Sequence, residues 1–195
     1  VERATLVDAV ANLDADPNNP NDSADKVGCL ISTKDYDSKE WLPAVVPGTV
    51  LTSYLKAGVV PDPNYADQQF LVSDSYFKSN FWYINKFEIP KSRKGERVWL
   101  NFEAINYKAE VYLNGHRLGN ILGAFTRAKF DITEYAKFGE DNYLAVLIYK
   151  NTDPGTPFVS GEYGPGTMGG VFGNDGSIGS DGPTHTASAG WDWVP

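Results

Sequence analysis

The last residues of the chain combine aromatic and acidic side chains that suit the binding of a sugar. Trp191, Asp192 and Trp193 hold two of the five tryptophans of the chain. The flat C–H face of a sugar ring stacks on an aromatic plane, and a carboxylate accepts hydrogen bonds from hydroxyls. Along an extended segment, Asp192 would point away from both tryptophans. Two interpretations stay open: the triplet contacts a sugar, or the tryptophans bury against the core.

Other polar residues near this triplet offer weaker chemistry. His185, in GPTHTASAG, could donate or accept a hydrogen bond in the same pocket, although a lone loop histidine is commonly just solvated. The acids Glu162, Asp175 and Asp181 raise the question of calcium, but NDGSIGSDG lacks the ligand spacing and the closing glutamate of a calcium loop. We therefore predict no metal and no other cofactor, with a structural calcium as the open alternative.

These candidates lie in a stretch, residues 152–195, that holds most of the glycines and shows no sustained periodicity. A loop of this length in a compact domain is generally functional or disordered. We assign residues 1–26 to a lead-in, residues 27–151 to the domain core, and residues 152–195 to a Gly-rich loop and tail of the same domain. Residues 14–26, rich in Asp, Asn and Pro, read as a surface loop.

One short helix must position the residues that follow it. Apolar residues recur at helical spacing from Val50 to Leu55, Thr49 can cap the start, and Gly58 can end the helix.

Alternation of apolar and polar residues predicts strands over most of the remaining core. The predicted strands are VGCLIS (with Cys29, the single cysteine), FWYINKFEIP, RVWLNFEA, YKAEVYLNGHRLG, AKFDIT and NYLAVLIY. Asn114 and Gly115 supply the two positive φ angles of a tight hairpin turn. Because strands dominate without βαβ alternation, the fold class is all-β, a sandwich of two sheets.

Some side chains in these strands can be assigned to the inside or the outside. We expect Trp82 in the core, Glu110 solvated, and His116 on the surface beside the hairpin turn. Trp99 and Tyr112 fall on the outward side of paired strands, where further domains could cover them.

Bulk composition excludes several classes of partner. The 195 residues suffice for one well-buried core, and the net charge of −8 would repel the phosphates of nucleic acid. No apolar run approaches the roughly 18 residues that cross a membrane. The first residues lack a basic-then-apolar signal pattern, so the chain is either cytoplasmic or the trimmed part of an exported protein. Of these we expect a secreted or periplasmic protein.

Several motifs occur in an order that resembles the N-terminal sugar-binding domain of glycoside hydrolase family 2. They are VPGTVLTSYLKAGVVPDPNY, FWYINKFEIP, RVWLNFEAINYKAEVYLNGHRLG, FDITEYAKFGEDNYLAVLIY and GWDWVP. The Trp-Asp-Trp tail is most similar to the branches of β-mannosidases and exo-β-glucosaminidases. One departure is Ile84-Asn85, where the family often has an arginine, so no role of that arginine is carried over.

The resemblance implies a galactose-binding-like jelly roll that precedes an immunoglobulin-like domain and a (β/α)8 barrel. It also implies that both catalytic glutamates of an exo-acting retaining β-glycosidase lie on the barrel, and that Asp192 with its flanking tryptophans helps hold the terminal sugar. A barrel needs about 250 residues and retaining chemistry two carboxyl groups roughly 5–5.5 Å apart. The chain shows neither pattern, so we expect an excised domain that does not hydrolyse glycosides alone.

Three functions remain under consideration. The first is part of the substrate pocket of such a glycosidase, whose partners are a β-linked sugar and the remaining domains. The second is a stand-alone carbohydrate-binding module that uses the same tail as a platform. The third is a purely structural interdomain module.

Overall fold

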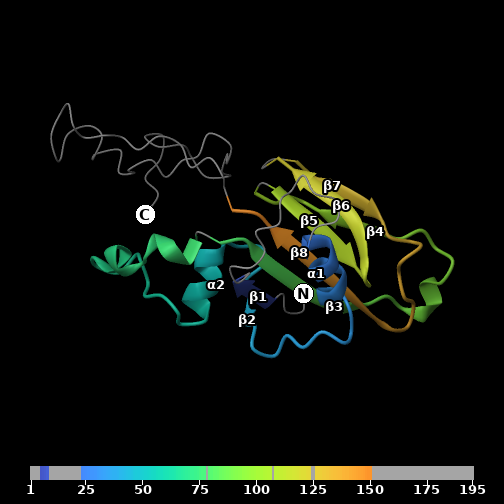
Figure 1. The fold of residues 1–195 in the computed structure, drawn as a ribbon, viewed down its shortest axis with the longest axis horizontal. Helices are drawn as coiled ribbons and strands as arrows, with labels where there is room; N and C mark the ends of the chain where they lie inside the picture. The colour runs from blue at the N-terminus through green and yellow to red at the C-terminus, as the bar shows by residue number, and fades with distance from the viewer. Residues whose placement is uncertain (1–4, 9–22, 78, 107, 124–125, 151–195) are drawn as a thin grey trace.

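The structure, a computed structural model, describes residues 5–8, 23–77, 79–106, 108–123 and 126–150 (Figure 1). Their elements in chain order are β1 (Thr5–Asp8), α1 (Ser23–Ile31), β2 (Leu42–Pro43), α2 (Val50–Lys56), the 3₁₀ helices η1 (Gln68–Leu71) and η2 (Asp74–Phe77), β3 (Phe81–Glu88), the 3₁₀ helix η3 (Lys91–Arg93), β4 (Trp99–Phe102), β5 (Lys108–Leu113), β6 (His116–Leu122), β7 (Ala128–Asp131) and β8 (Asp141–Ile148).

The strands form two antiparallel sheets. The larger has the order β2-β1-β3-β8-β5-β6, and the smaller pairs β4 with β7. Successive residues of a strand face opposite sides of its sheet, so each strand of the larger sheet feeds two packing layers. This arrangement confirms the predicted all-β sandwich.

The main core lies between the two sheets. Ala109, Val111 and Leu113 of β5 are fully buried there beside Leu144 and Val146 of β8. Residues from the smaller sheet close the layer from the other side: Leu100, Phe102, Ala128 and Phe130. The alternation predicted for these strands is thus confirmed on the described residues.

Helix α1 covers the opposite face of the larger sheet (Figure 1). Its Ile31 packs in a cluster with Trp82 and Tyr112, which are 2% and 0% exposed. Gly28 allows the close approach, because a β-carbon there would lie 2.5 Å from ring atoms of Tyr112. Trp82 is therefore a core residue, as predicted.

Four predictions on this face are wrong. Residues 27–32, with Cys29, are not a strand, since residues 27–31 belong to α1, and residues 23–26 of the predicted loop begin that helix. Tyr112 does not face outward to a missing domain, because α1 covers it. Glu110 is not solvated, because Arg117 pairs with it and leaves its side chain 15% exposed. The helix α1 and its packing on the sheet decide the first three, and the ion pair with Arg117 decides the last.

The hairpin between β5 and β6 turns as predicted, with φ angles of 50° at Asn114 and 85° at Gly115. The Asn114 amide donates to the Tyr135 carbonyl and to Oδ1 of the buried Asn142, both at 2.8 Å, and its oxygen accepts from the Tyr143 N–H at 2.9 Å. The turn is thereby fixed to the segment that leads into β8.

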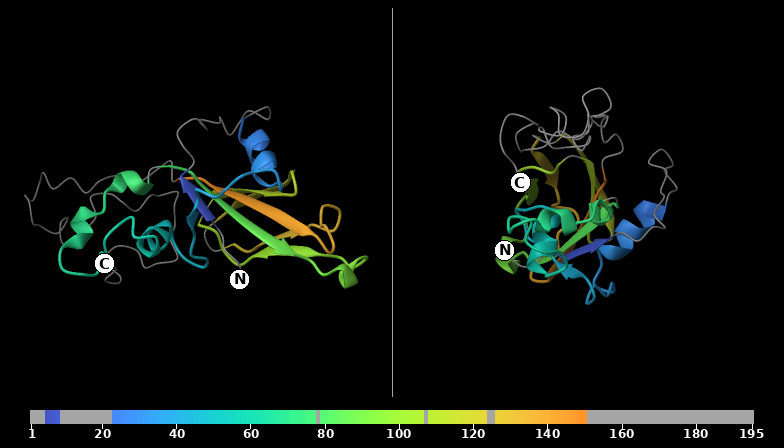
Figure 2. Two further views of the ribbon diagram at one scale, coloured as in Figure 1. Left: turned by 90° about the horizontal axis from the view of Figure 1, so that it is seen from below. Right: turned by 90° about the vertical axis from the view of Figure 1, so that its left-hand side faces the viewer.

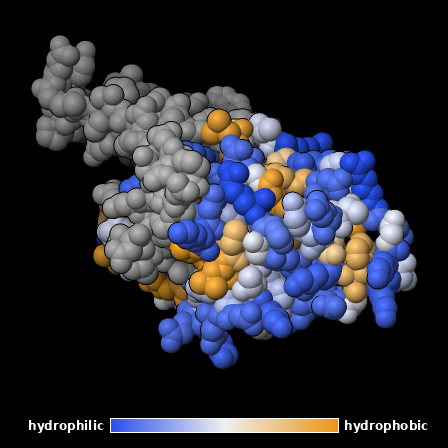
Figure 3. Space-filling view, turned by 45° about the vertical axis from the view of Figure 1, so that its right-hand side comes forward, coloured by the Kyte–Doolittle hydropathy of each residue, from blue (hydrophilic) through white to orange (hydrophobic). Residues whose placement is uncertain are grey.

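The surface of the hairpin also agrees with expectation. His116 is exposed, and its ring stacks on Tyr135 with centroids 4.6 Å apart. On the face shown in Figure 3, most of the described surface is hydrophilic and the hydrophobic areas are separate patches.

Helix α2 confirms the predicted short helix. The Thr49 hydroxyl accepts from the Thr52 N–H at 3.1 Å at its start, and Gly58 follows its end with a φ of 72°. Neither α2 nor any other helix in the described ranges has the length and apolar character needed to span a membrane.

Candidate functional site

The residues that the sequence analysis placed in a sugar site lie outside the described residues. These are Trp191, Asp192, Trp193 and His185, together with the loop acids Glu162, Asp175 and Asp181. Their roles stay predictions.

The described chain ends at a fixed point beside the larger sheet. The Lys150 N–H donates to Oδ1 of Asn80 at 2.9 Å, and the Tyr149 N–H donates to the Lys108 carbonyl at 3.0 Å. Asn80 directly precedes β3, so the end of β8 is held between β3 and β5. Helix α2 lies at this same end of the sheets (Figure 1).

An arm of residues 59–77 projects from that end of the molecule, as Figure 1 and the left view of Figure 2 show. We call residues 59–77 the apolar arm. Both of its ends are anchored: Val60 is buried with Tyr54 and Phe81, and Tyr76 and Phe77 pack against the same cluster. The base of the arm is therefore part of the protein core.

The tip of the apolar arm exposes large apolar side chains. Tyr65 and Leu71 are each 69% exposed and Phe70 is 81% exposed. Large apolar side chains exposed within one short segment are typical of a surface that another molecule or domain covers. The sequence analysis assigned no role to this arm, although three large apolar residues in a polar loop were a readable signal.

A second group of polar side chains joins α1 to β5 and β6. Arg117 pairs with Glu110 at 2.5 Å and with Asp25 at 3.3 Å, and the Tyr112 hydroxyl donates to Asp25 at 2.9 Å. Burial raises the pKa of Glu110, although hydrogen bonds from Arg117 oppose that effect.

This group has no features of a glycosidase carboxylate pair. Arg117 binds both carboxylates, so neither is free to attack a sugar or to deliver a proton to it. The group instead satisfies the buried Tyr112 hydroxyl and ties the helix to the sheet.

Trp99 lies on the outer side of the smaller sheet and is 38% exposed, as predicted. The Arg97 guanidinium lies 4.7 Å and the Lys129 ammonium 4.3 Å from the centre of its ring. Hydrogen bonds from Thr133 and then Arg97 hold the pKa of Asp131 at about 2. Because the Arg97 and Lys129 cations already stack on the indole ring, Trp99 is not an open platform for a sugar.

Within the described ranges, no three His, Cys, Asp or Glu side chains come together to hold a metal ion. The open alternative of a loop calcium falls on residues outside those ranges.

Comparison with known proteins assigns the family. The profile described as the glycosyl hydrolase 2 galactose-binding domain-like family matches residues 31–195. The chain belongs to this family. The resemblance inferred from the motifs and the galactose-binding-like sandwich is thereby confirmed for this glycosyl hydrolase 2 domain.

Individual relatives of the glycosyl hydrolase 2 domain are much longer proteins. The mannosylglycoprotein endo-β-mannosidase of Lilium longiflorum is 40% identical over 161 residues, which are 80% of this chain and 16% of the lily protein. The chain thus spans about one sixth of that relative.

Solved structures of glycosidases carry the same fold. The exo-chitosanase CsxA of Amycolatopsis orientalis matches 80% of this chain and 17% of its own with a TM-score of 0.62 at 22% identity, a likeness of fold alone. The β-D-mannosidase of Dictyoglomus thermophilum matches 58% of this chain and 14% of its own with a TM-score of 0.52 at 29% identity.

Proposed function

We propose that this chain is the N-terminal sugar-binding domain of a longer β-glycosidase, to which it supplies scaffold and part of the substrate pocket. The observation that carries the proposal is the family match over residues 31–195, which includes the Trp-Asp-Trp triplet. The catalytic glutamates lie in other domains of the parent, whose reaction is exo-acting and retaining.

In this pocket Asp192 accepts hydrogen bonds from hydroxyls of the terminal sugar, and Trp191 or Trp193 covers an apolar face of the ring. His185 lines the same pocket. The substrate is a β-mannoside or a β-glucosaminide. The lily relative and the Dictyoglomus protein, both mannosidases by name, support the mannoside.

One observation supports a variant of this function. The relative that is 40% identical over 80% of the chain is an endo-β-mannosidase that is named for mannosylglycoproteins. An endo-acting parent would bind sugar on both sides of the cleaved bond. Assaying the full-length protein on a mannosylglycopeptide and on p-nitrophenyl β-mannoside separates the two: release of an oligosaccharide identifies endo cleavage, and release of single mannose identifies exo cleavage.

The decisive experiment replaces the acid in the full-length protein. A hydrogen bond to a charged group contributes about 1.5–3 kcal/mol, so we expect Asp192→Ala to lower kcat/KM about 10- to 100-fold. The matched control is Asp181→Ala, a loop acid outside the triplet, which should leave kcat/KM unchanged. Equal kcat/KM for the Asp192 variant and the parent on both substrates would refute the pocket role.

Two further measurements address the other functions. Calorimetric titration of the 195-residue chain with oligosaccharides would reveal micromolar to low-millimolar affinity if it were a stand-alone module. Trp193→Ala in the full-length protein would lower the melting temperature but spare sugar hydrolysis if the tail were purely structural.

A further inference from the structure

We propose that the tip of the apolar arm docks into an apolar pocket with a basic rim on a later domain of the same polypeptide. The proposal rests on the proposed function, because it takes the chain to be one domain of a longer glycosidase. It assigns a partner to a surface for which the sugar pocket gives no role.

The side chains at the tip are exposed beyond what the fold of this domain requires. Val60, Tyr76 and Phe77 already anchor the arm, so Phe70 and Leu71 add nothing to the packing of its base. Their exposed fractions of 81% and 69% are costly in water, and burial of each side chain against a partner would be favourable.

The backbone of the arm is ordered for binding before any partner arrives. Asp62 accepts from the N–H of Asn64 at 2.9 Å, and the N–H groups of Tyr65, Gln68 and Phe70 donate to backbone carbonyls of the same segment at 3.0–3.2 Å. Docking such a segment costs little conformational entropy, in contrast to a loop that must first be ordered.

The charge around the tip selects the partner. The charged residues of the arm are Asp62, Asp67 and Asp74, and the arm contains neither Lys nor Arg. A partner with basic residues at the rim of its apolar pocket complements this charge, and like charges would be repelled.

The same argument disfavours residues 151–195 as the cover, although they follow directly from Lys150. All five charged residues of that segment are acidic: Asp153, Glu162, Asp175, Asp181 and Asp192.

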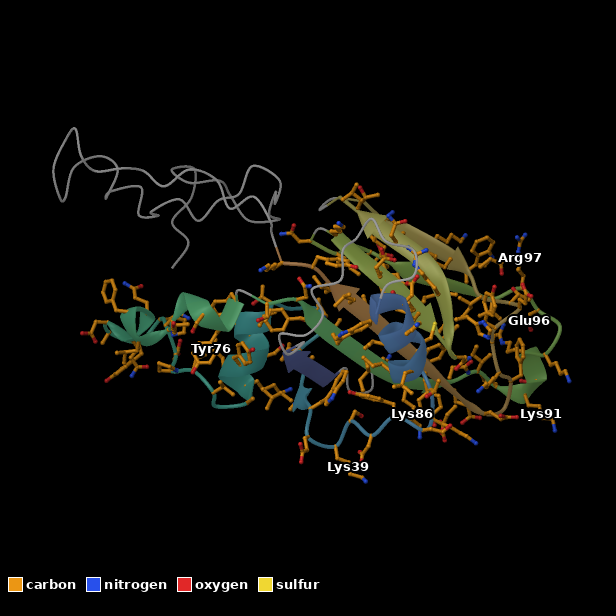
Figure 4. All side chains as sticks on the ribbon, viewed as in Figure 1. Lys39, Tyr76, Lys86, Lys91, Glu96 and Arg97 are labelled. Carbon is orange, nitrogen blue, oxygen red and sulfur yellow. The ribbon has the colours of Figure 1, made fainter. Side chains whose placement is uncertain are left out.

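A second copy is a competing partner, because basic side chains lie at the far end of the molecule. Lys91 and Arg97 lie there, away from Tyr76 at the base of the arm (Figure 4). Arg97 is paired with Asp131 and Arg93 with Glu96, which weakens this end as a basic rim. A contact between unlike ends also does not close into a dimer.

Hydroxyl-radical footprinting of the full-length protein tests the proposal. Leu71 and Leu122 are the same residue type, 69% and 62% exposed, and Leu122 lies on β6 and not in the arm. We expect Leu71 to be oxidised several-fold more slowly than Leu122 at every protein concentration. Equal rates would overturn the proposal, and protection that disappears on dilution would assign the surface to a second copy instead.

A charge reversal at Asp67 distinguishes a basic partner domain from the acidic residues 151–195 as the partner of the arm. Asp67 is exposed and its side chain makes no capping hydrogen bond to η1, so Asp67→Lys leaves the arm intact. Against a basic rim the new lysine repels the partner, and oxidation of Leu71 should speed up. Slower oxidation would overturn the proposal in favour of the acidic residues 151–195, and unchanged oxidation would overturn it by showing that the partner has no basic rim. These rates do not depend on sugar turnover, so the kinetics of Asp192→Ala can fail while the footprint succeeds, or the reverse.

Discussion

Two tyrosines that pack in the core, Tyr83 and Tyr112, have raised pKa values and keep their protons at unusually high pH. Burial and, to a smaller extent, the neighbouring Tyr54 raise the pKa of Tyr83 to about 12. Burial and the hydrogen bond to Asp25 also raise the pKa of Tyr112. These hydroxyls therefore make the folded state sensitive to alkaline pH.

The Tyr83 hydroxyl gives a pH prediction with a definite sign. An unfolded tyrosine has a pKa near 10. Between that pH and about 12 the folded state keeps a proton that the unfolded chain has lost, so the stability from Tyr83 is complete below pH 10 and is lost as the pH rises. For this partly exposed ring, the loss is on the order of 1–2 kcal/mol.

Denaturant unfolding between pH 9 and 11.5 measures this effect. Tyr83→Phe should show a shallower fall in the free energy of unfolding than the parent. Tyr65→Phe, at an exposed site, should follow the parent curve. If the Tyr83 variant retained the parent slope, Tyr83 would not be the titrating group.

At the scale of elements, the position of α1 depends on one close contact with β5. Gly-to-Ala exchange inside a helix is generally stabilising by about 1 kcal/mol. At Gly28 the added carbon would meet the Tyr112 ring at 2.5 Å, so we expect Gly28→Ala to lower the free energy of unfolding by about 1–3 kcal/mol.

A double-mutant cycle tests the cause. In a Tyr112→Leu background the ring is gone, and Gly28→Ala should become neutral or stabilising as measured by chemical denaturation. Equal effects of Gly28→Ala in both backgrounds would show that the Tyr112 ring is not the obstacle.

The helices and turns that depend on the residue types at their own ends were predictable from the sequence. The helix whose place depends on tertiary packing was not. Thr49 and Gly58 mark α2, and Asn114-Gly115 marks the hairpin, because caps and positive φ angles restrict residue type locally. Residues 27–32 form a short apolar run that reads as a strand, yet Val27 and Ile31 also share a helical face. The sequence does not reveal that Tyr112, far along the chain, leaves space for a helix at Gly28.

At the scale of the whole molecule, the sequence indicates the family and the sandwich, but the site only as a hypothesis. The motifs read in order predicted both family and fold, and the family profile confirms them. Asp192 and its neighbours stay predictions, because they lie outside the residues that the structure describes. The apolar arm was overlooked although Tyr65, Phe70 and Leu71 stand in a polar loop, because the sequence does not show that these side chains are exposed.

Metal binding is also tested on the whole chain. We expect that neither EDTA nor millimolar calcium chloride shifts the melting temperature of the 195-residue protein, because the spacing of Glu162, Asp175 and Asp181 does not fit a calcium loop. Differential scanning calorimetry measures the melting temperature with and without each addition. A rise of several degrees with calcium, reversed by EDTA and absent in Asp181→Asn, would establish a structural ion.

The hairpin turn has a consequence for the chemical ageing of the protein. Asn-Gly pairs deamidate when the glycine nitrogen attacks the asparagine side-chain carbonyl. Here Gly115 N–H donates to the Ser32 hydroxyl at 3.1 Å, while the Asn114 amide is held by Tyr135, Asn142 and Tyr143. Nucleophile and target are thus held apart as long as α1 stays docked. The helix that the sequence analysis predicted as a strand therefore protects the Asn114 side chain from deamidation, and loosening of this helix would expose that side chain to irreversible damage.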